Sequence, residues 1–446
     1  MVELIVKNGY NLNIAGRPVS EVSVAVTPNR VAMLPERIPY IKPKLLVKEG
    51  ESVALGAPVF CDKRDKRIWF PSPGGGRVEK IVFGPRRVIQ AIVIALEADE
   101  AVSSYPGYTA DALRDMDRSE LVTAILERGG WHVLKSLPFR DIASPEEIPP
   151  AIRVCLDNDE PFHPEARTYL EGKGELLQYG LTVLSRLCDR VQVSMAKGTD
   201  LGDQTISSLV THRIRGPYPA NDPGVWVYHA KKDPRENRSW YVAGQDLLYL
   251  AALLKDGRSS VDRFVTVAGS AALERRTVQT RIGAPVADLV KIHGSWDRAK
   301  LIAGGIFRGY EVNHDDYLGW YETGLVAVPR GGEKEFFGFA RPGANKPSYS
   351  RTFLSVFKKA PFNMDCGMHG EERACVNCSS CADVCPVDML PQFTMKAIYA
   401  GEVEEALEHG MLDCVCCGLC SYVCPSKIDL TTMIKHARED YYKESA

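Results

Sequence analysis

The first hundred residues carry short runs of valine, isoleucine and leucine, separated by segments rich in glycine and proline. Apolar runs such as Leu45–Val47, Val53–Leu55 and Ile81–Val82 are only two or three residues long. Short strands at regular spacing, bounded by turn-forming residues, are typical of an all-β unit. The pattern therefore predicts a compact β domain over residues 1–100.

Within this unit the sequence resembles a biotinyl/lipoyl-like β-sandwich, on the pattern VKEGESV…APVFCDK…FPSPGGGRVEKIV…RVIQAIVIAL. The tight turn that would hold the attachment lysine of such a carrier reads PSPGGG instead, so we expect no swinging arm. A phosphate-binding loop follows a strand and opens a helix. Because residues 77–82 (RVEKIV) continue as a strand, we interpret Gly74–Gly76 as a hairpin turn.

From about residue 100 the apolar positions recur at steps of three and four, and Ala110–Arg128 is predicted to be a helix. An apolar strand at 151–156, a leucine-rich helix at Thr168–Cys188 and a second strand at 190–196 follow. The order strand, helix, strand predicts a Rossmann-like parallel sheet over residues 101–258.

The loops 157–161 and 196–199 follow the two strands and are expected at the carboxyl edge of the sheet, where such folds bind ligands. No G-x-G-x-x-G motif occurs there, so the sequence does not support a dinucleotide site. We interpret the acidic run Asp157, Asp159 and Glu160 as a solvated or capping loop rather than a metal site.

The remaining chain divides into a β-rich and a helical part. Strands separated by glycine turns predict a β-grasp (ubiquitin-like) module over residues 259–330. Residues 331–446 are expected to be helical, with a helix at Ile398–His409 and a closing amphipathic helix at Leu430–Lys443. Asp429 is the predicted N-cap of that last helix. The predicted fold class is thus α/β multidomain.

Two cysteine runs in this helical part share one spacing. The order C-x2-C-x2-C-x3-C, followed by proline, begins at Cys375 and again at Cys414. Bacterial two-cluster ferredoxins have this spacing, and the fourth cysteine of each run ligates the other run's cluster. We predict two 4Fe-4S clusters, the first held by Cys375, Cys378, Cys381 and Cys424, and the second by Cys414, Cys417, Cys420 and Cys385. No catalytic side chain is predicted.

A disulfide framework and a pair of structural zinc sites are the alternatives. Zinc sites use four ligands in pairs with variable gaps and do not call for a doubled three-plus-one run with proline. Cys416 is out of phase with the ligands and is interpreted as a packed thiol, and Cys366 as a structural residue. Gly418 is expected to leave a backbone N–H free to approach a cluster. Four valines are expected to shield the clusters: Val376, Val384, Val415 and Val423.

The composition of the chain limits the partners and the location that we expect. The 446 residues carry a formal net charge of −2, and without a basic surface we expect no nucleic-acid partner. The five other cysteines are scattered, as in a reducing compartment. No signal peptide and no apolar run of about 18–20 residues is visible, so any work at a membrane would rely on other subunits for the spans.

Five segments carry a family resemblance. They are similar to the A subunit of the Na⁺-translocating NADH:quinone reductase (Nqr), and the likeness runs to about residue 360. The cysteine-rich tail departs from typical Nqr A subunits. It resembles the C subunit of the related Rnf complex, but the glycine-rich flavin and NADH loop of that C subunit is missing here. The segments are IAGRP (14–18), GPYPA (216–220), VAGSAALERRTVQTRIGAP (267–285), YLGWY (317–321) and FFGFARPGANKPSYSRTFL (336–354).

The resemblance implies a peripheral electron-transfer subunit, docked on membrane subunits at the cytoplasmic face of the membrane. Electrons would pass through the two clusters between a flavin- or Fe–S-bearing partner and a quinone or another carrier. The missing glycine loop argues against FMN, and quinone is kept as a candidate ligand near GPYPA or residues 336–342. A dehydrogenase that itself binds NADH or flavin, and a redox-sensing scaffold, are the alternative functions.

Overall fold

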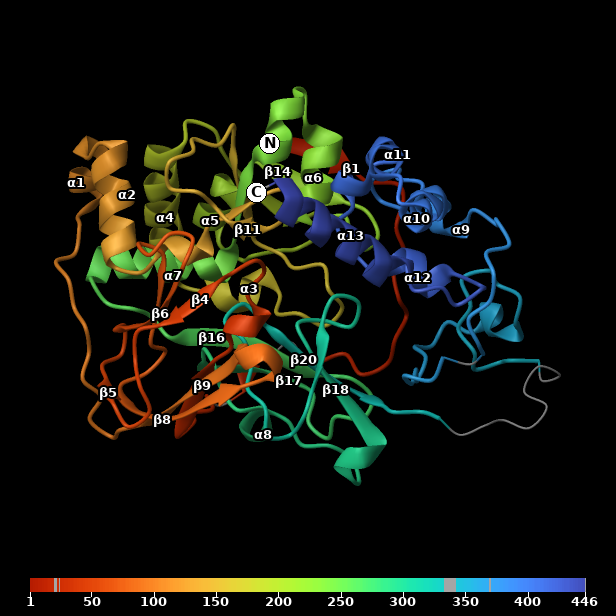
Figure 1. The fold of residues 1–446 in the computed structure, drawn as a ribbon, viewed down its shortest axis with the longest axis horizontal. Coiled ribbons are helices and arrows are strands. Elements are labelled where there is room, and N and C mark those ends of the chain that lie inside the picture. The colour runs from red at the N-terminus through yellow and green to blue at the C-terminus, as the bar shows by residue number, and fades with distance from the viewer. Residues whose placement is uncertain (20–21, 24, 333–341, 369, 446) are drawn as a thin grey trace.

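The computed structural model describes residues 1–19, 22–23, 25–332, 342–368 and 370–445. Within them the strands form four sheets (Figure 1). Helices pack beside the largest sheet, and a separate group of helices forms the C-terminal end of the chain. This mixed arrangement agrees with the predicted α/β multidomain class.

The largest sheet is built around parallel strands. β12 and β13 pair in parallel across the helices that connect them, which confirms the predicted strand–helix–strand unit. Parallel pairing continues from β13 to β14 and from β12 to β15, while β10 and β11 extend the sheet antiparallel. The spatial order is β1 (Val2–Ile5), β14 (His212–Arg215), β13 (Val191–Ala196), β12 (Ile152–Cys155), β15 (Trp240–Ala243), β10 (Lys135–Ser136) and β11 (Asp141–Ile142).

The first strand does not lie with the β domain predicted over residues 1–100. β1 pairs in parallel with β14 at the edge of the large sheet, beside α6 in Figure 1. β2 (Val22–Ser23) pairs with β17 (Arg276–Arg281) in another sheet. Pairing over such sequence distances leaves no local pattern. The domain boundaries at residues 100, 258 and 330 stay predictions.

Two helices predicted as continuous are each broken. The 110–128 segment forms α1 (Ala110–Asp115) and α2 (Arg118–Glu127), because Asp117 starts a new helix through a capping box with Glu120. The 168–188 segment forms α3 (Ala166–Leu170) and α4 (Gly174–Leu187), separated by Gly172 at φ +67°. The other helices here are α5 (Gln204–Leu209), α6 (Pro223–Ala230) and α7 (Gly244–Asp256).

The N-terminal β unit consists of two small sheets. Gly74–Gly76 connects β7 in one sheet to β8 in the other, so it is not a hairpin turn as predicted. The chain does continue as a strand from Gly76, which agrees with the rejection of a phosphate loop. The orders are β3 (Arg30–Met33), β9 (Ile89–Leu96), β8 (Gly76–Phe83), β5 (Ser52–Val53), and β4 (Pro43–Leu45), β6 (Pro58–Asp62), β7 (Trp69–Pro71).

A mixed six-stranded sheet follows the α/β unit. β16 pairs antiparallel with β17 and parallel with β20, the strand from the far end of the segment. The β-grasp label for this segment stays a prediction. The order is β19 (Tyr310–Val312), β18 (Ala299–Ala303), β20 (Gly324–Pro329), β16 (Asp262–Ala268), β17 and β2, with α8 (Val286–Leu289) between β17 and β18.

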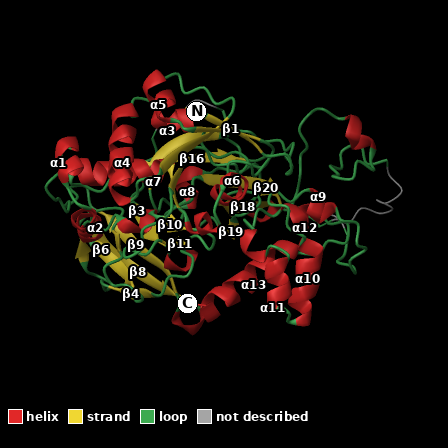
Figure 2. Ribbon diagram, turned by 90° about the horizontal axis from the view of Figure 1, so that it is seen from above, coloured by secondary structure: helices red, strands yellow, loops and turns green. Residues whose placement is uncertain are grey.

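The C-terminal helices lie together at one side of the molecule (Figure 2). The helix predicted at 398–409 is instead the end of α10 and the separate α11, because Gly401 ends α10 at φ +76°. Asp429 accepts a hydrogen bond from the Thr432 N–H at 3.2 Å, which confirms the predicted cap. The helices are α9 (Ser380–Asp383), α10 (Pro391–Ala400), α11 (Val403–Glu408), α12 (Leu419–Val423) and α13 (Leu430–Ser445).

One apolar core joins these helices to the α/β unit. Val6, Ile214 and Trp226 pack in the same cluster of buried side chains as Val384 and Leu419 beside the cysteines. The cysteine runs are therefore built against the body of the protein. No helix in the described ranges combines the length and apolarity needed to cross a bilayer.

Candidate metal centre

Each cysteine run opens with a turn in which a backbone N–H donates to the first sulfur. The Asn377 N–H donates to Cys375 Sγ, and the Cys416 N–H to Cys414 Sγ, both at 3.4 Å. Asn377 and Cys416 both adopt the left-handed conformation, with φ of 56° and 51°. N–H donors aimed at sulfur favour the thiolate, which is the form that binds iron.

The similarity between the two cysteine runs extends along their whole length. Further left-handed positions recur at the 39-residue offset that separates Cys375 from Cys414: Ser379 with Gly418, and Asp388 with Lys427. The helices that follow the runs, α10 and α13, also begin 39 residues apart. The two stretches therefore fold as one repeated unit, as the doubled spacing predicts.

The start of each following helix contacts a cysteine. Cys381 Sγ lies 3.2 Å from Gln392 Oε1 in the first turn of α10. At the matching place Cys420 Sγ lies 3.3 Å from Thr431 Oγ1 in the first turn of α13. Helix N-termini favour negative charge, so both helices are oriented to stabilise an anionic group held by the cysteines.

The first predicted ligand set lies around one cavity. Cys375, Cys378, Cys381 and Cys424 all line it, so the fourth thiol comes from the other run, in the crossed arrangement that the ferredoxin spacing predicts. Four thiols suit the four iron corners of a cube, and the donor set fits a 4Fe-4S cluster. The rest of the lining is largely apolar, including Met395, Ile428 and Leu430.

The second predicted set is also brought together. The pKa of the Cys420 thiol is raised to about 12, mainly by burial and in part by the neighbouring thiols of Cys385 and Cys381. Burial likewise raises the pKa of Cys417, with Cys420 and Cys385 adding to it. Cys385 of the first run therefore lies beside the second set, and Cys381 places the two sets next to each other. Among the described side chains no three of His, Cys, Asp or Glu form a site for a single metal ion.

Three of the four predicted shielding valines are buried. Val384, Val415 and Val423 have exposed fractions of 1%, 5% and 7%. Val376 also lines the cavity of the first set, but it is 68% exposed and therefore covers that site only at the surface.

Gly418 is required for a different reason from the predicted one. Its φ is +80°, and a Cβ there would lie 3.2 Å from the carbonyl oxygen of Phe307. The neighbouring Leu419 N–H hydrogen bonds to Cys417. The glycine thus allows the left-handed turn and close packing on Phe307, and the donor to sulfur is the next residue.

Two side chains of the body reach the cysteine runs, one at each run. The Tyr218 hydroxyl, in the GPYPA segment, lies 2.7 Å from Glu160 Oε1 and 2.9 Å from the Cys417 carbonyl oxygen. Its ring stacks on Phe307 with 4.7 Å between centroids. His229 on α6 lies 2.7 Å from the Pro386 carbonyl oxygen, after the fourth cysteine of the first run.

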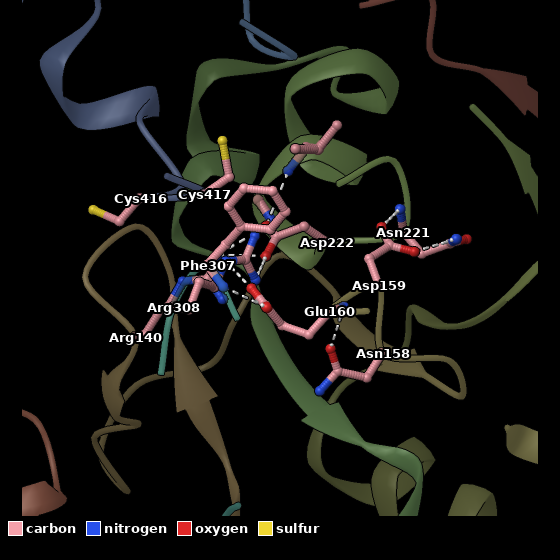
Figure 3. Close-up of polar contacts among 12 residues, drawn as sticks. Arg140, Asn158, Asp159, Glu160, Asn221, Asp222, Phe307, Arg308, Cys416 and Cys417 are labelled. Atoms are coloured by element: carbon pink, nitrogen blue, oxygen red, sulfur yellow. Dashed lines mark hydrogen bonds and ion pairs between the residues drawn. The ribbon is translucent and has the colours of Figure 1, made fainter. Parts of the chain in front are cut away.

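A buried network of charges lies behind these contacts (Figure 3). Arg140 and Arg308 each lie 2.7 Å from Asp222, and Arg308 lies 3.7 Å from Glu160. Burial raises the pKa of Glu160, an effect that Arg308 and Tyr218 oppose. The network joins the α/β unit to the loop before β19 and ends beside Cys417.

The acidic loop after β12 is partly solvated: Asn158 is exposed and Asp157 and Asp159 are half-buried, but Glu160 is buried, so the solvated interpretation is wrong for Glu160. Asp157 does hydrogen bond to the Ala166 N–H at the start of α3, in agreement with a capping role. Burial raises the pKa of Asp159 to about 7, although two hydrogen bonds from Asn221 lower it. Glu160 belongs to the charge network. Their partners lie far away in sequence, which is why the local pattern gives a solvated loop.

A second cavity, of about 550 Å³, lies at the predicted carboxyl edge of the large sheet. The loops after β12 and β13 both line it, as expected from their positions. Its lining is polar and includes four carboxylates together with Arg17 and Tyr218: Asp157, Asp159, Glu160 and Glu165. Of the 336–342 block proposed for quinone, only Pro342 falls among the described residues.

Sequence reasoning missed the arginines of the site. Arg140, Arg308 and Arg438 come from three separate elements, and none stands at a fixed spacing from a cysteine run that a ferredoxin motif would reveal. For Arg438 the 39-residue repeat offers a signal, because it aligns Arg438 with Tyr399 and so shows a charged residue in the second half of the cysteine unit where the first half has an uncharged one.

Comparison with known proteins agrees with this architecture. A family model described as the NqrA N-terminal barrel-sandwich hybrid domain matches residues 4–97, and one described as the NqrA second alpha/beta domain matches residues 116–259. The A subunit of the Na⁺-translocating NADH-quinone reductase from Klebsiella pneumoniae (strain 342) is 32% identical, over 95% of this chain and 96% of that protein. The chain belongs to the NqrA family. The protein of the same name from Haemophilus influenzae KW20 is 30% identical, over 99% of this chain and 100% of that protein.

The tail is matched separately, since a 4Fe-4S dicluster domain model covers residues 374–429 and all eight predicted ligands. Together with the two NqrA domain models, this match confirms the predicted combination of an NqrA body with a ferredoxin-type tail. The NqrA relatives are named as subunits of an oxidoreductase complex. A solved NAD⁺-reducing [NiFe]-hydrogenase aligns at 11% identity and a TM-score of 0.38, over 78% of this chain and 67% of that one. A likeness at that level carries no argument about function.

Proposed function

We propose that this chain is a peripheral electron-transfer subunit of an Nqr-type oxidoreductase and relays electrons through two 4Fe-4S clusters. The observation that carries the proposal is the cavity lined by Cys375, Cys378, Cys381 and Cys424, which joins three thiols of one run to the last thiol of the other. Bound there, a 4Fe-4S cluster accepts and releases one electron at a time. Cys414, Cys417, Cys420 and Cys385 hold the second.

The chain's own residues have two roles in such a relay. The apolar side chains and the N–H donors around the sulfurs set the reduction potentials. The exposed Cys375 and Cys378 allow a redox partner to approach the first site closely. The relatives are named for a Na⁺-translocating NADH-quinone reductase, and we infer that this chain docks on membrane subunits of such a complex, at the cytoplasmic face.

The crossed ligand sets are tested by four serine variants. Purified anaerobically, the wild type should contain about eight irons and each variant about four. C375S and C424S should lose the same EPR signal after dithionite reduction, and C414S and C385S the other. C366S is the control, because Cys366 is a cysteine outside both sets, and it should keep both signals.

Two results would contradict this assignment. Full iron in C375S or C414S would show that these cysteines are not ligands. Loss of the same signal in C424S and C414S would show that each run holds its own cluster, without crossing.

A second candidate function is a dehydrogenase, favoured by the polar cavity at the carboxyl edge of the large sheet. Tyr218 lines that cavity and also contacts the Cys417 carbonyl, so a flavin, NADH or quinone there would lie close to the second site. The carboxylates of the lining oppose phosphate groups, which is why the relay is preferred. Stoichiometric flavin, or reduction of the clusters by NADH without a partner, would select the dehydrogenase.

A further inference from the structure

Arg438 on α13 is a buried cation beside the second cysteine run. Its exposed fraction is 6%. One terminal nitrogen, Nη1, donates to the Cys414 carbonyl oxygen and lies 3.2 Å from Cys416 Sγ. The other, Nη2, donates to the Pro138 carbonyl oxygen at 2.9 Å, and Nε has no hydrogen-bond partner among the residues that the structure describes.

None of these acceptors is a carboxylate. Among the described residues no Asp or Glu oxygen lies within 4.0 Å of the Arg438 guanidinium, and the carboxylates nearby are held by other cations. Asp141, on the same loop as Pro138, is paired with Arg64 at 2.6 Å, and Asp222 with Arg140 at 2.7 Å. The adjacent Glu439 faces Lys435 at 4.0 Å.

The Cys416 thiol is thus the one acidic side chain within hydrogen-bond distance of Arg438 among the described residues. A buried guanidinium without a carboxylate partner is unfavourable, so a further negative group should help to compensate it. The ligands next to it supply one, because four thiolates around a 4Fe-4S core give the whole site a net negative charge. Cys414, whose carbonyl oxygen Arg438 holds, is a proposed ligand of the second cluster.

We propose that Arg438 is the counter-charge of the second cluster and raises its reduction potential above that of the first. This inference rests on the proposed function. Reduction adds one electron to an already negative site, so a fixed cation in a poorly solvated place stabilises the reduced form. The electron that the first cluster loses on oxidation is the one that the second gains on reduction.

The repeated fold supplies the reason why the clusters differ. At the 39-residue offset Arg438 corresponds to Tyr399 on α10, an uncharged side chain that is 68% exposed. The first set also has two exposed cysteines, and water screens charges around it. Electrons from a docked partner would therefore enter at the exposed first cluster and move inward to the second.

The test is an EPR-monitored redox titration of the purified full-length chain, with C414S used to assign the signal of the second cluster. In R438Q the equilibrium constant for reducing the second cluster should fall at least tenfold, which is 59 mV for one electron. The first cluster should be unchanged. R438K, which keeps the cation, should retain most of the wild-type potential, and Y399F should shift neither.

Every outcome bears on the inference. Unchanged potentials in R438Q, or equal shifts of both clusters, would overturn it. About eight irons in R438K but about four in R438Q would support it, because a cation is then needed for binding. About four irons in both variants would overturn it, since Arg438 then only holds the ligand loop. A wild type without about eight irons would instead overturn the proposed function itself.

Discussion

Asp222 is the carboxylate at the centre of the buried charge network, and its replacement by asparagine is a direct test of that network. Its side chain is 0% exposed and is paired with Arg140 and Arg308, each at 2.7 Å. It also caps α6 by accepting a hydrogen bond from the Gly224 N–H at 2.8 Å. Asp222→Asn keeps the size and the capping oxygen but leaves the half-buried guanidinium groups of Arg140 and Arg308 with less counter-charge.

The magnitude follows from the pKa of Asp222. Burial alone would raise that pKa, but Arg140 and Arg308 outweigh burial and lower it from 3.8 to about 2. At 1.36 kcal/mol per pH unit this corresponds to about 2 kcal/mol of stabilisation. Breaking a buried ion pair costs about 3–5 kcal/mol, so we expect α6 to lose about 2–5 kcal/mol. Because the folded-state pKa is depressed, this stabilisation is present above pH 4 and is lost as the pH falls towards 2.

Hydrogen exchange of the α6 amides at neutral pH is the appropriate assay, since a chain of several domains need not unfold in one step. A loss of about 2 kcal/mol or more should speed exchange at least about thirtyfold. Asp203→Asn is the matched control. Asp203 caps α5 through the Thr205 and Ile206 N–H groups. It has no arginine partner among the described residues, and asparagine caps a helix about as well as aspartate.

Two results would refute this reasoning. Unchanged exchange of α6 in Asp222→Asn would mean that the arginines do not depend on this carboxylate. An equal increase of exchange at α5 in Asp203→Asn would assign the effect to helix capping, with no contribution from the ion pairs.

Two further substitutions test single features. Lys135 lies 3.7 Å from the Tyr321 ring centroid, and burial lowers its pKa to about 8. The wild type should therefore gain stability relative to Lys135→Met as the pH rises from about 8 to 10.5, by up to about 3 kcal/mol. Denaturant midpoints of both proteins from pH 7 to 10 measure this, and a difference that does not change with pH would mean that the lysine is solvated in the folded protein. Asp429→Ala removes the cap of α13, so hydrogen exchange of the Thr432 amide should become faster, by an amount that corresponds to about 1 kcal/mol of lost protection. The EPR signals should stay unchanged, and the loss of a signal would mean that the cap is needed to hold the cluster.

The parts of this structure that the sequence predicts are those whose determinants are local. Cysteine spacing predicts the repeated turns that the structure shows, because each turn closes within three residues and a proline follows. The β12–α4–β13 unit follows from apolar periodicity. The break between α1 and α2 was also readable, since Asp117 and Glu120 form a capping box that the apolar spacing alone conceals.

What could not be predicted depends on contacts between distant segments. β1 reads as part of the first β unit but pairs with β14, more than 200 residues later. Glu160 reads as a solvated acid because its partners, Tyr218 and Arg308, lie in other elements. Arg438 has no local signal at all, since its surroundings are made by the Pro138 loop and the Cys414 turn.

These distant contacts give the two halves of the cysteine unit different surroundings. The first cavity is lined by the exposed Cys375 and Cys378, whereas the Cys417 turn is packed against Phe307 and Tyr218 of the body. A ferredoxin repeat by itself is close to symmetric, so direction must come from what covers each half. Here the body also contacts the first half, through His229 on the Pro386 carbonyl, but it brings the Arg308 network only to the second half, where α13 adds Arg438. The same packing that holds the cysteine unit on the NqrA-like body therefore also makes its two sites inequivalent.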